Sequence, residues 1–113
     1  MNLTTSHVGP IVVVHVGEAR LTYPILGDFA AAVTALINNG DARIVIDLSP
    51  VTYLDSATIG CLMDLYRQAA AVGGAVKLAG VQKRVETMLT MTGAQNFLEV
   101  HADQASALAS FGG

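Results

Sequence analysis

The segment RIVIDLSPVTYLDSATIG, residues 43–60, contains the transition that decides the fold. It begins as a short apolar run rich in β-branched residues, RIVIDLS (43–49), which is typical of a buried strand. After a polar loop, Ile59 starts a helical spacing of apolar side chains that continues to Ala70. A buried strand that leads into an amphipathic helix predicts one unit of an α/β fold.

The same alternation of strand and helix patterns extends over the rest of the chain. Apolar runs bounded by turn residues predict strands at 3–7, 11–16, 43–49, 75–80 and 97–100. Apolar residues at helical spacing predict helices within 24–39, 56–72, 81–92 and 102–111. The first two strands can form a hairpin through Gly9 and Pro10, and the helices between later strands imply parallel pairing through right-handed crossovers. We therefore expect an α/β sandwich with a mixed, mostly parallel sheet of four to five strands and about four helices.

The composition narrows the class of protein. A chain of 113 residues fits a single domain over 1–113, and a hydrophobic fraction of 52% with 13% charged residues excludes a disordered chain. The net charge of −3 and the thin spread of six Lys and Arg argue against nucleic-acid binding, which needs clustered basic side chains. We expect a soluble domain without direct membrane insertion, because no apolar run reaches about 18 residues and no basic-then-apolar leader opens the chain.

Cysteine and histidine usage gives no sign of a metal or redox centre. Cys61 is the single cysteine, so neither an intrachain disulfide nor a thiolate cluster can form, which is compatible with the reducing cytoplasm where we place the protein. His7, His15 and His101 lie far apart in the sequence and lack metal-ligand spacing. We predict ordinary surface or core histidines and expect no metal and no cofactor.

The pair Asp55-Ser56, at the start of the predicted second helix, has three interpretations. Ser56 can act as a helix cap by accepting a backbone N–H from the first turn. It can also accept a phosphate, since free N–H groups and the positive end of the helix dipole stabilise an anion there. Catalysis is the weakest interpretation: Asp47 and Asp55 lack a third ligand or a nearby histidine, and the Gly-x-Ser-x-Gly pattern of many hydrolases is absent.

With these motifs in view, the chain resembles the STAS domain family (sulfate transporter and anti-sigma factor antagonist), in particular its free-standing bacterial antagonists. The resemblance covers nearly the whole chain and rests on these features: Gly17-Glu18 after the apolar strand, IVIDLSPVTYLDS, the Gly-Gly turn before AVKLAG, and VQKRVETMLTMTGAQNFLEV. It implies that Ser56 is phosphorylated by a partner. In that family the unphosphorylated antagonist binds an anti-sigma factor that is also the serine kinase, and thereby releases a sigma factor. Phosphorylation ends the binding, and a phosphatase would reverse it, so the domain itself would not be an enzyme.

The resemblance also implies a partner-facing surface. It comprises the loop and helix start with Thr52, Asp55, Ser56, Ala57 and Thr58, together with the loop that carries Glu18 and Arg20, while Asp47 has a supporting role. Two departures stand out, since many members have a glycine where this chain has Thr58 and an acidic residue where it has Arg20. The alternative is a STAS subunit that regulates a membrane transporter, of the lipid-transporting ABC or anion-transporter kind, without serine phosphorylation. A homodimer is left open by the pattern.

Overall fold

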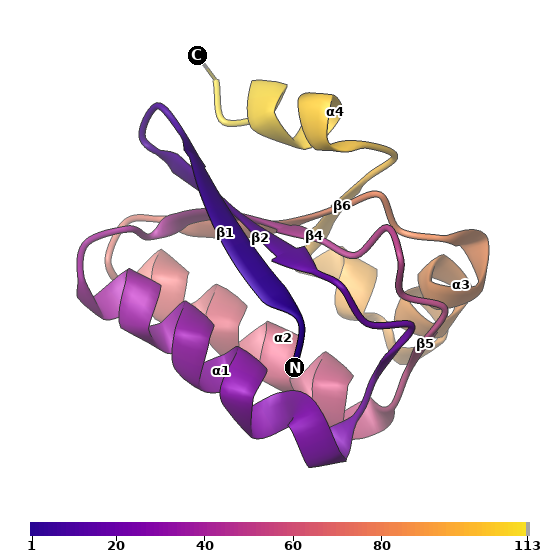
Figure 1. Cartoon of the computed structure of the whole chain (residues 1–113). Coiled ribbons are helices and arrows are strands. Elements are labelled where there is room, and N and C mark those ends of the chain that lie inside the picture. Colours follow the sequence, from indigo (N-terminus) through magenta and orange to yellow (C-terminus); the bar gives the residue numbers. More distant parts are fainter. Residues whose placement is uncertain (113) are drawn as a thin grey trace.

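A five-stranded sheet forms the centre of the molecule. The computed structural model describes residues 1–112. The sheet has the order β1-β2-β4-β6-β7 and consists of β1 (Leu3–Val8), β2 (Ile11–Val16), β4 (Arg43–Asp47), β6 (Ala75–Ala79) and β7 (Glu99–His101). β1 and β2 pair antiparallel as a hairpin, and the other neighbours pair in parallel (Figure 1). The predicted mixed, mostly parallel sheet is therefore confirmed.

Helices cover the two faces of this sheet unequally. They are α1 (Tyr23–Asn38), α2 (Ser56–Ala71), α3 (Lys83–Thr92) and α4 (Gln104–Ala109), with a 3₁₀ helix, η1 (Ala94–Asn96), after α3. The two long helices α1 and α2 lie against one face, and the short α4 lies against the other (Figure 1). The prediction of an α/β sandwich with about four helices is thus confirmed.

The central strand β4 explains why both faces are covered. Its side chains alternate, so Ile44 and Ile46 join the large cluster under α1 and α2, while Val45 joins a smaller cluster with Ala107 of α4. All three β4 side chains are fully buried, and each such burial contributes about 1.5–3 kcal/mol. Because β4 is buried on both faces, its sequence is a continuous apolar run rather than an alternation of apolar and polar residues.

The short α4 is held down by a buried lysine. The ammonium of Lys77 on β6 donates to the Ser110 carbonyl oxygen (3.0 Å) and hydroxyl (2.9 Å), and lies 3.1 Å from Glu99 Oε2. It also lies 4.4 Å from the centre of the Phe111 ring. Lys77 therefore fastens the end of α4 through charge-assisted hydrogen bonds and a cation–π contact.

Several predicted boundaries were wrong by about two residues. β4 ends at Asp47 rather than at residue 49, because Asp47 Oδ1 accepts the Ser49 N–H at 2.9 Å and turns the chain out of the sheet. α3 begins at Lys83 rather than at residue 81. The last strand is 99–101 rather than 97–100, since the Leu98 N–H donates to the Ala94 carbonyl and belongs to the turn of η1.

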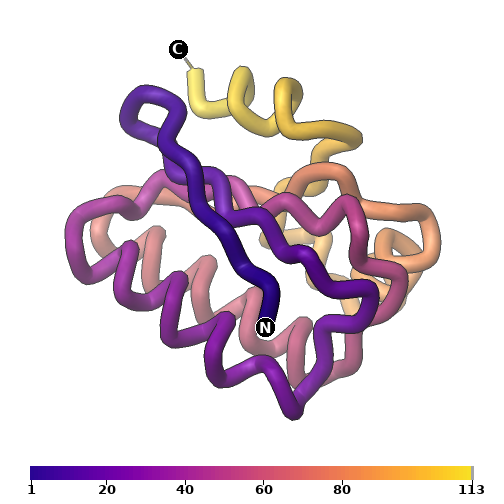
Figure 2. The backbone as a smooth tube through the Cα atoms, in the orientation of Figure 1, coloured from indigo at the N-terminus to yellow at the C-terminus, as the bar shows by residue number. Residues whose placement is uncertain are grey.

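A second, two-stranded parallel ladder was not predicted. β3 (Arg20–Leu21) pairs with β5 (Tyr53–Leu54), beyond the carboxyl ends of β2 and β4. Figure 2 shows the two segments that carry these strands running side by side, although they are far apart in the sequence. The ladder joins the loop after β2 to the loop before α2, the two loops on which the predicted surface lies.

Candidate functional site

Ser56 is the first residue of α2 and is exposed to solvent. The prediction that Ser56 itself caps the helix was wrong. The cap is Asp55, whose extended backbone (φ −98°, ψ 174°) and side chain satisfy the first turn. Because Asp55 performs the capping, the Ser56 hydroxyl is free of that task at the surface.

Asp55 binds two elements at once. Its Oδ1 accepts the Thr58 N–H at 2.9 Å, which is the capping bond of α2. Its Oδ2 accepts the Tyr23 N–H at 2.8 Å, at the first residue of α1. One carboxylate therefore fixes the starts of both long helices relative to each other, directly beside the Ser56 hydroxyl.

These bonds change the acidity of Asp55. Its partial burial by itself would raise the pKa, but the hydrogen bonds from the Thr58 side chain and from the Tyr23 and Thr58 N–H groups outweigh it. The pKa of Asp55 therefore lies below the usual value of an aspartate, and at neutral pH the group next to Ser56 is a carboxylate.

Thr58 lies inside the protein rather than on the partner-facing surface where the resemblance placed it. The residue is fully buried. Its hydroxyl lies 2.8 Å from the Leu21 carbonyl oxygen and 2.7 Å from Asp55 Oδ1, and with one hydrogen it donates to one of them at a time. The departure from glycine at this position therefore supplies a buried polar link between α2 and β3.

The two predicted loops meet through their backbones and side chains. The Thr52 N–H and hydroxyl both donate to the Ala19 carbonyl oxygen, at 2.7 and 3.0 Å. The Arg20 guanidinium lies 4.4 Å from the centre of the Tyr53 ring, a cation–π contact. The structure thus brings Arg20 and Thr52 to the same region as Asp55, and Ala57 is exposed next to Ser56.

Glu18 lies in the same loop but is directed to a different partner. Its Oε2 accepts the Asn2 N–H at 2.6 Å, so the carboxylate holds the chain just before β1. Glu18 is half-buried and is engaged by the main chain. Arg20, two residues later in the same loop, is exposed.

Apolar hollows flank the start of α2 on both sides. One, of about 250 Å³, lies between α2 and α3; its lining includes Ser56, Ile59 and Met88, and its margin is formed by Met91, which is 81% exposed. The other, of about 450 Å³, lies between α1 and α2; Tyr23, 74% exposed, lies beside it. Tyr23 was not predicted from the sequence, where its only signal is the Tyr-Pro pair at the start of the helix.

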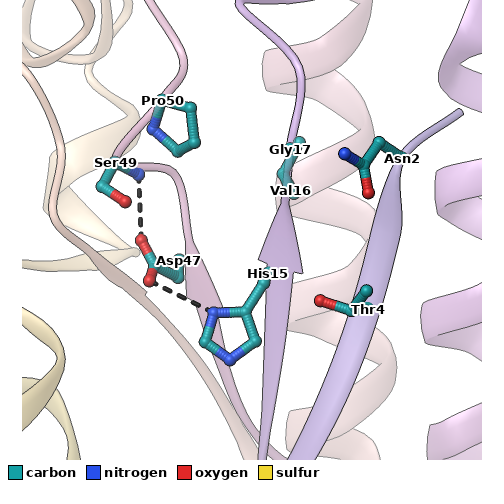
Figure 3. A pocket seen from close by; sticks show the side chains of 8 residues that line it. All are labelled: Asn2, Thr4, His15, Val16, Gly17, Asp47, Ser49 and Pro50. Carbon is teal, nitrogen blue, oxygen red and sulfur yellow. Dashed lines mark hydrogen bonds and ion pairs between the residues drawn. The ribbon is translucent and has the colours of Figure 1, made fainter.

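Asp47 lines a separate pocket of about 210 Å³, together with both polar and apolar residues (Figure 3). Its Oδ1 accepts the Ser49 N–H, and its Oδ2 lies 3.4 Å from His15 Nδ1. Parallel pairing of β2 and β4 places His15 and Asp47 directly opposite each other, a relation that spacing in the sequence did not reveal. Through the Ser49 turn, Asp47 shapes the start of the loop that leads to Ser56.

The loop that leads to Ser56 is fixed at its outer side as well. The Gln82 side-chain amide donates to the Ser49 carbonyl oxygen at 2.7 Å. Gly80, with φ +68°, passes so close that a Cβ there would lie 2.9 Å from the Ser49 Cβ. This position requires glycine both for its backbone conformation and for the close approach of the loop.

The catalytic interpretations gain no support from this geometry. Asp47 and Asp55 bind different groups, as described above. The histidines also have partners of their own: His7 lies 3.8 Å from Asp41, His15 lies next to Asp47, and His101 lies 3.0 Å from Glu99. Within residues 1–112, no three His, Cys, Asp or Glu side chains gather closely enough to hold a metal ion.

The single cysteine, Cys61, lies in α2. It is half-buried beside the hollow between α1 and α2. Burial, together with the negative charge of Asp64, raises the pKa of the Cys61 thiol. The thiol is therefore protonated and weakly reactive at neutral pH.

Comparison with known proteins gives a consistent result at the level of sequence. The family model for the STAS domain matches residues 2–107. A protein of Thermotoga neapolitana, named as an anti-sigma factor antagonist homologue, is 28% identical over 72 residues. That match spans 64% of this chain and 64% of the relative's own length.

Solved structures share the fold over almost the whole chain. A Thermotoga maritima protein described as an anti-sigma factor antagonist has a TM-score of 0.87 and 20% identity, covering 96% of this chain and 92% of its own. The phosphorylated form of the Bacillus cell fate determinant SpoIIAA has a TM-score of 0.74 and 17% identity, with 97% and 99% covered.

The same fold also occurs inside a much larger membrane protein. The murine anion transporter Slc26a9 has a TM-score of 0.76 and 16% identity, and the match covers 93% of this chain but 18% of the transporter. In the part of this chain that the structure describes, no helix combines the length and apolar character needed to span a bilayer.

Proposed function

The chain belongs to the STAS domain family, and from that premise we propose that it is an anti-sigma factor antagonist switched by phosphorylation of Ser56. In its unphosphorylated form it binds an anti-sigma factor with serine kinase activity and so releases a sigma factor. Phosphorylation of Ser56 ends this binding, and a phosphatase restores it. The chain acts in the cytoplasm as phosphoacceptor and binding surface, while ATP and its magnesium ion belong to the kinase.

The observation that carries the proposal is the position of Ser56. Its hydroxyl is exposed at the first residue of a 16-residue helix, where the N–H groups of the first turn have no preceding intrahelical acceptor. A phosphate there is stabilised by the helix dipole and by the first-turn N–H groups other than that of Thr58, which Asp55 already caps. The fold can therefore carry the modification without rearranging its core.

The surroundings of Ser56 explain how a phosphate would act on a partner. It adds a charge of about −1.5 to −2 beside the Asp55 carboxylate, which is already ionised. The neighbouring hollows are lined by apolar side chains such as Ile59 and Met88. A partner that packs apolar groups against them would have to desolvate two adjacent negative charges, so binding weakens.

We infer that the partner-facing surface consists of Arg20, Thr52, Ser56, Ala57 and the exposed margins of the two hollows. Asp55 contributes its charge and the fixed geometry of the helix start. Thr58 acts from inside the protein, and Asp47 acts through the turn at Ser49.

A second candidate function rests on the likeness to the domain inside the anion transporter. In that case the chain would be a STAS subunit of a transporter, and the same face would contact the transport partner or its ATPase without phosphorylation. The two proposals differ in whether Ser56 accepts a phosphate, and this difference can be measured directly.

The test is an intact-mass measurement after incubation with ATP, magnesium and the serine kinase encoded beside this chain's gene. We expect one added phosphate in the native chain and in Ser49→Ala, a matched control in the same loop, and none in Ser56→Ala. Binding to the kinase, followed by calorimetry, should be weakened by Ser56→Asp and retained by Ser56→Ala. No phosphate on the native chain, together with co-purification with a transporter ATPase, would favour the transporter subunit.

A further inference from the structure

β1 is the outer strand at one edge of the sheet, and half of its backbone groups point away from the molecule. The Gly17 N–H donates to the Asn2 carbonyl oxygen at 2.8 Å, which shows that the backbone of Asn2 faces β2. Hydrogen-bonding groups alternate along an antiparallel ladder, so the backbones of Thr4 and Ser6 also face β2. The N–H and C=O groups of Leu3, Thr5 and His7 therefore point away from β2, on the open side of the edge strand.

This edge lacks the features that keep sheet edges apart. The strand LTTSHV contains no Lys, Arg, Asp, Glu or Pro, and five of its six residues are exposed. The opposite edge strand, β7, has three residues, one of which is the charged Glu99. An uncharged six-residue edge strand in a sheet of this kind is a ready template for pairing with another strand.

The strand is complementary to itself. In an antiparallel pair centred on Thr5, the outward groups of Thr5 meet those of Thr5 in a second copy, and those of Leu3 meet those of His7. The three outward residues of each strand then form six backbone hydrogen bonds about a two-fold axis, and no outward group within the pair lacks a partner. The strand has no Lys, Arg, Asp or Glu, so no like charges of these residues face each other across the pair.

We propose that two copies of this chain associate through β1 in this register and form one continuous ten-stranded sheet. The occupant of the edge is a second copy rather than an unrelated peptide, because the two-fold pairing satisfies all the outward groups with this strand alone. The interface lies outside the loop and helix start that carry Ser56, so it does not depend on the proposed phosphorylation.

Hydrogen exchange followed residue by residue provides the test. In the dimer the amides of Thr5 and His7 are hydrogen-bonded. Their hydrogens then exchange with solvent only when the dimer dissociates into monomers. When nine-tenths of the chains are dimeric, exchange of these two amides should slow about tenfold relative to dilute protein. The Thr4 and Ser6 amides, bonded to β2 in either state, serve as internal references.

Two variants at one position separate pairing from side-chain effects. Thr5→Ala keeps the amide donor and should sediment as a dimer at the concentrations where the native chain does. Thr5→Pro deletes the donor and should sediment as a monomer with an unchanged circular dichroism spectrum. A monomer at millimolar concentration with fast Thr5 exchange, or a dimer that persists in folded Thr5→Pro, would overturn the proposal. If Thr5→Pro does not fold, the native chain alone still tests the proposal. Exchange of the Thr5 and His7 amides that does not slow as the protein concentration rises would then overturn it.

Discussion

Removal of the Asp55 carboxylate should destabilise the protein more than loss of an ordinary helix cap. In Asp55→Ala, α2 loses its capping bond to the Thr58 N–H, and α1 loses the bond that fixes the Tyr23 N–H. Loss of a capping side chain costs about 0.5–2 kcal/mol. Loss of the bond at Tyr23, where water can replace the carboxylate, adds about 0.5–1 kcal/mol. We therefore expect a decrease of about 2 kcal/mol in the free energy of unfolding.

Urea denaturation followed by circular dichroism measures this change. With an m-value of about 1.5 kcal/mol/M, the midpoint should fall by about 1.3 M. Asp103→Ala is the matched control, because Asp103 caps α4 through the Ser106 N–H at 2.8 Å, in an exposed setting on a six-residue helix. Its effect should stay below about 1 kcal/mol. Equal effects of the two variants would refute the argument that Asp55 joins the two long helices.

Three further predictions follow from the same structure. Thr58→Val keeps the shape but removes the hydroxyl that donates to the Leu21 carbonyl or to Asp55 Oδ1, which should cost about 1–3 kcal/mol in urea denaturation; no change in stability would show that neither bond stabilises the fold. Lys77→Met removes the bonds to Ser110, so amide exchange should accelerate mainly in α4; equal acceleration throughout the sheet would contradict a local fastening role. The pKa of Asp55 is lower in the folded chain than in the unfolded chain. The Asp55 carboxylate therefore adds to the free energy of unfolding above the ordinary aspartate pKa, and this stabilisation is lost as the pH falls through the lower, folded value. The stability difference between the native chain and Asp55→Asn should therefore shrink on acidification, and a constant difference would exclude this linkage.

The fold could be predicted because its main elements carry strong local signals. The apolar run at 43–49 is continuous because β4 is buried on both faces, and the spacing in α1 and α2 reflects one buried side of each helix. The ladder of β3 and β5 could not be predicted, since two-residue strands have no measurable periodicity. The shift of β7 has a similar cause, because the apolar residues Phe97 and Leu98 resemble the start of a strand but follow the turn of η1.

The residues around the start of α2 could be named from the sequence, but the contacts that each of them makes could not. Asp and Ser are both good helix caps, so a boundary uncertain by one residue could not tell which of Asp55 and Ser56 caps α2. Burial of Thr58 depends on the Leu21 carbonyl from a distant loop, and the pairing of His15 with Asp47 depends on strand register. Such contacts are set by tertiary packing and leave no trace in the local pattern.

The ladder of β3 and β5 has a consequence for the thermodynamics of association. It ties the Thr52 loop to the Ala19 carbonyl, and Asp55 ties the helix start to α1, so this surface is held in one arrangement before any partner arrives. A partner that docks there spends little free energy on immobilising it, and affinity depends on the fit and charge of preformed groups. Binding through this region should accordingly show the small entropic penalty of rigid partners, rather than the large one of a segment that folds on contact.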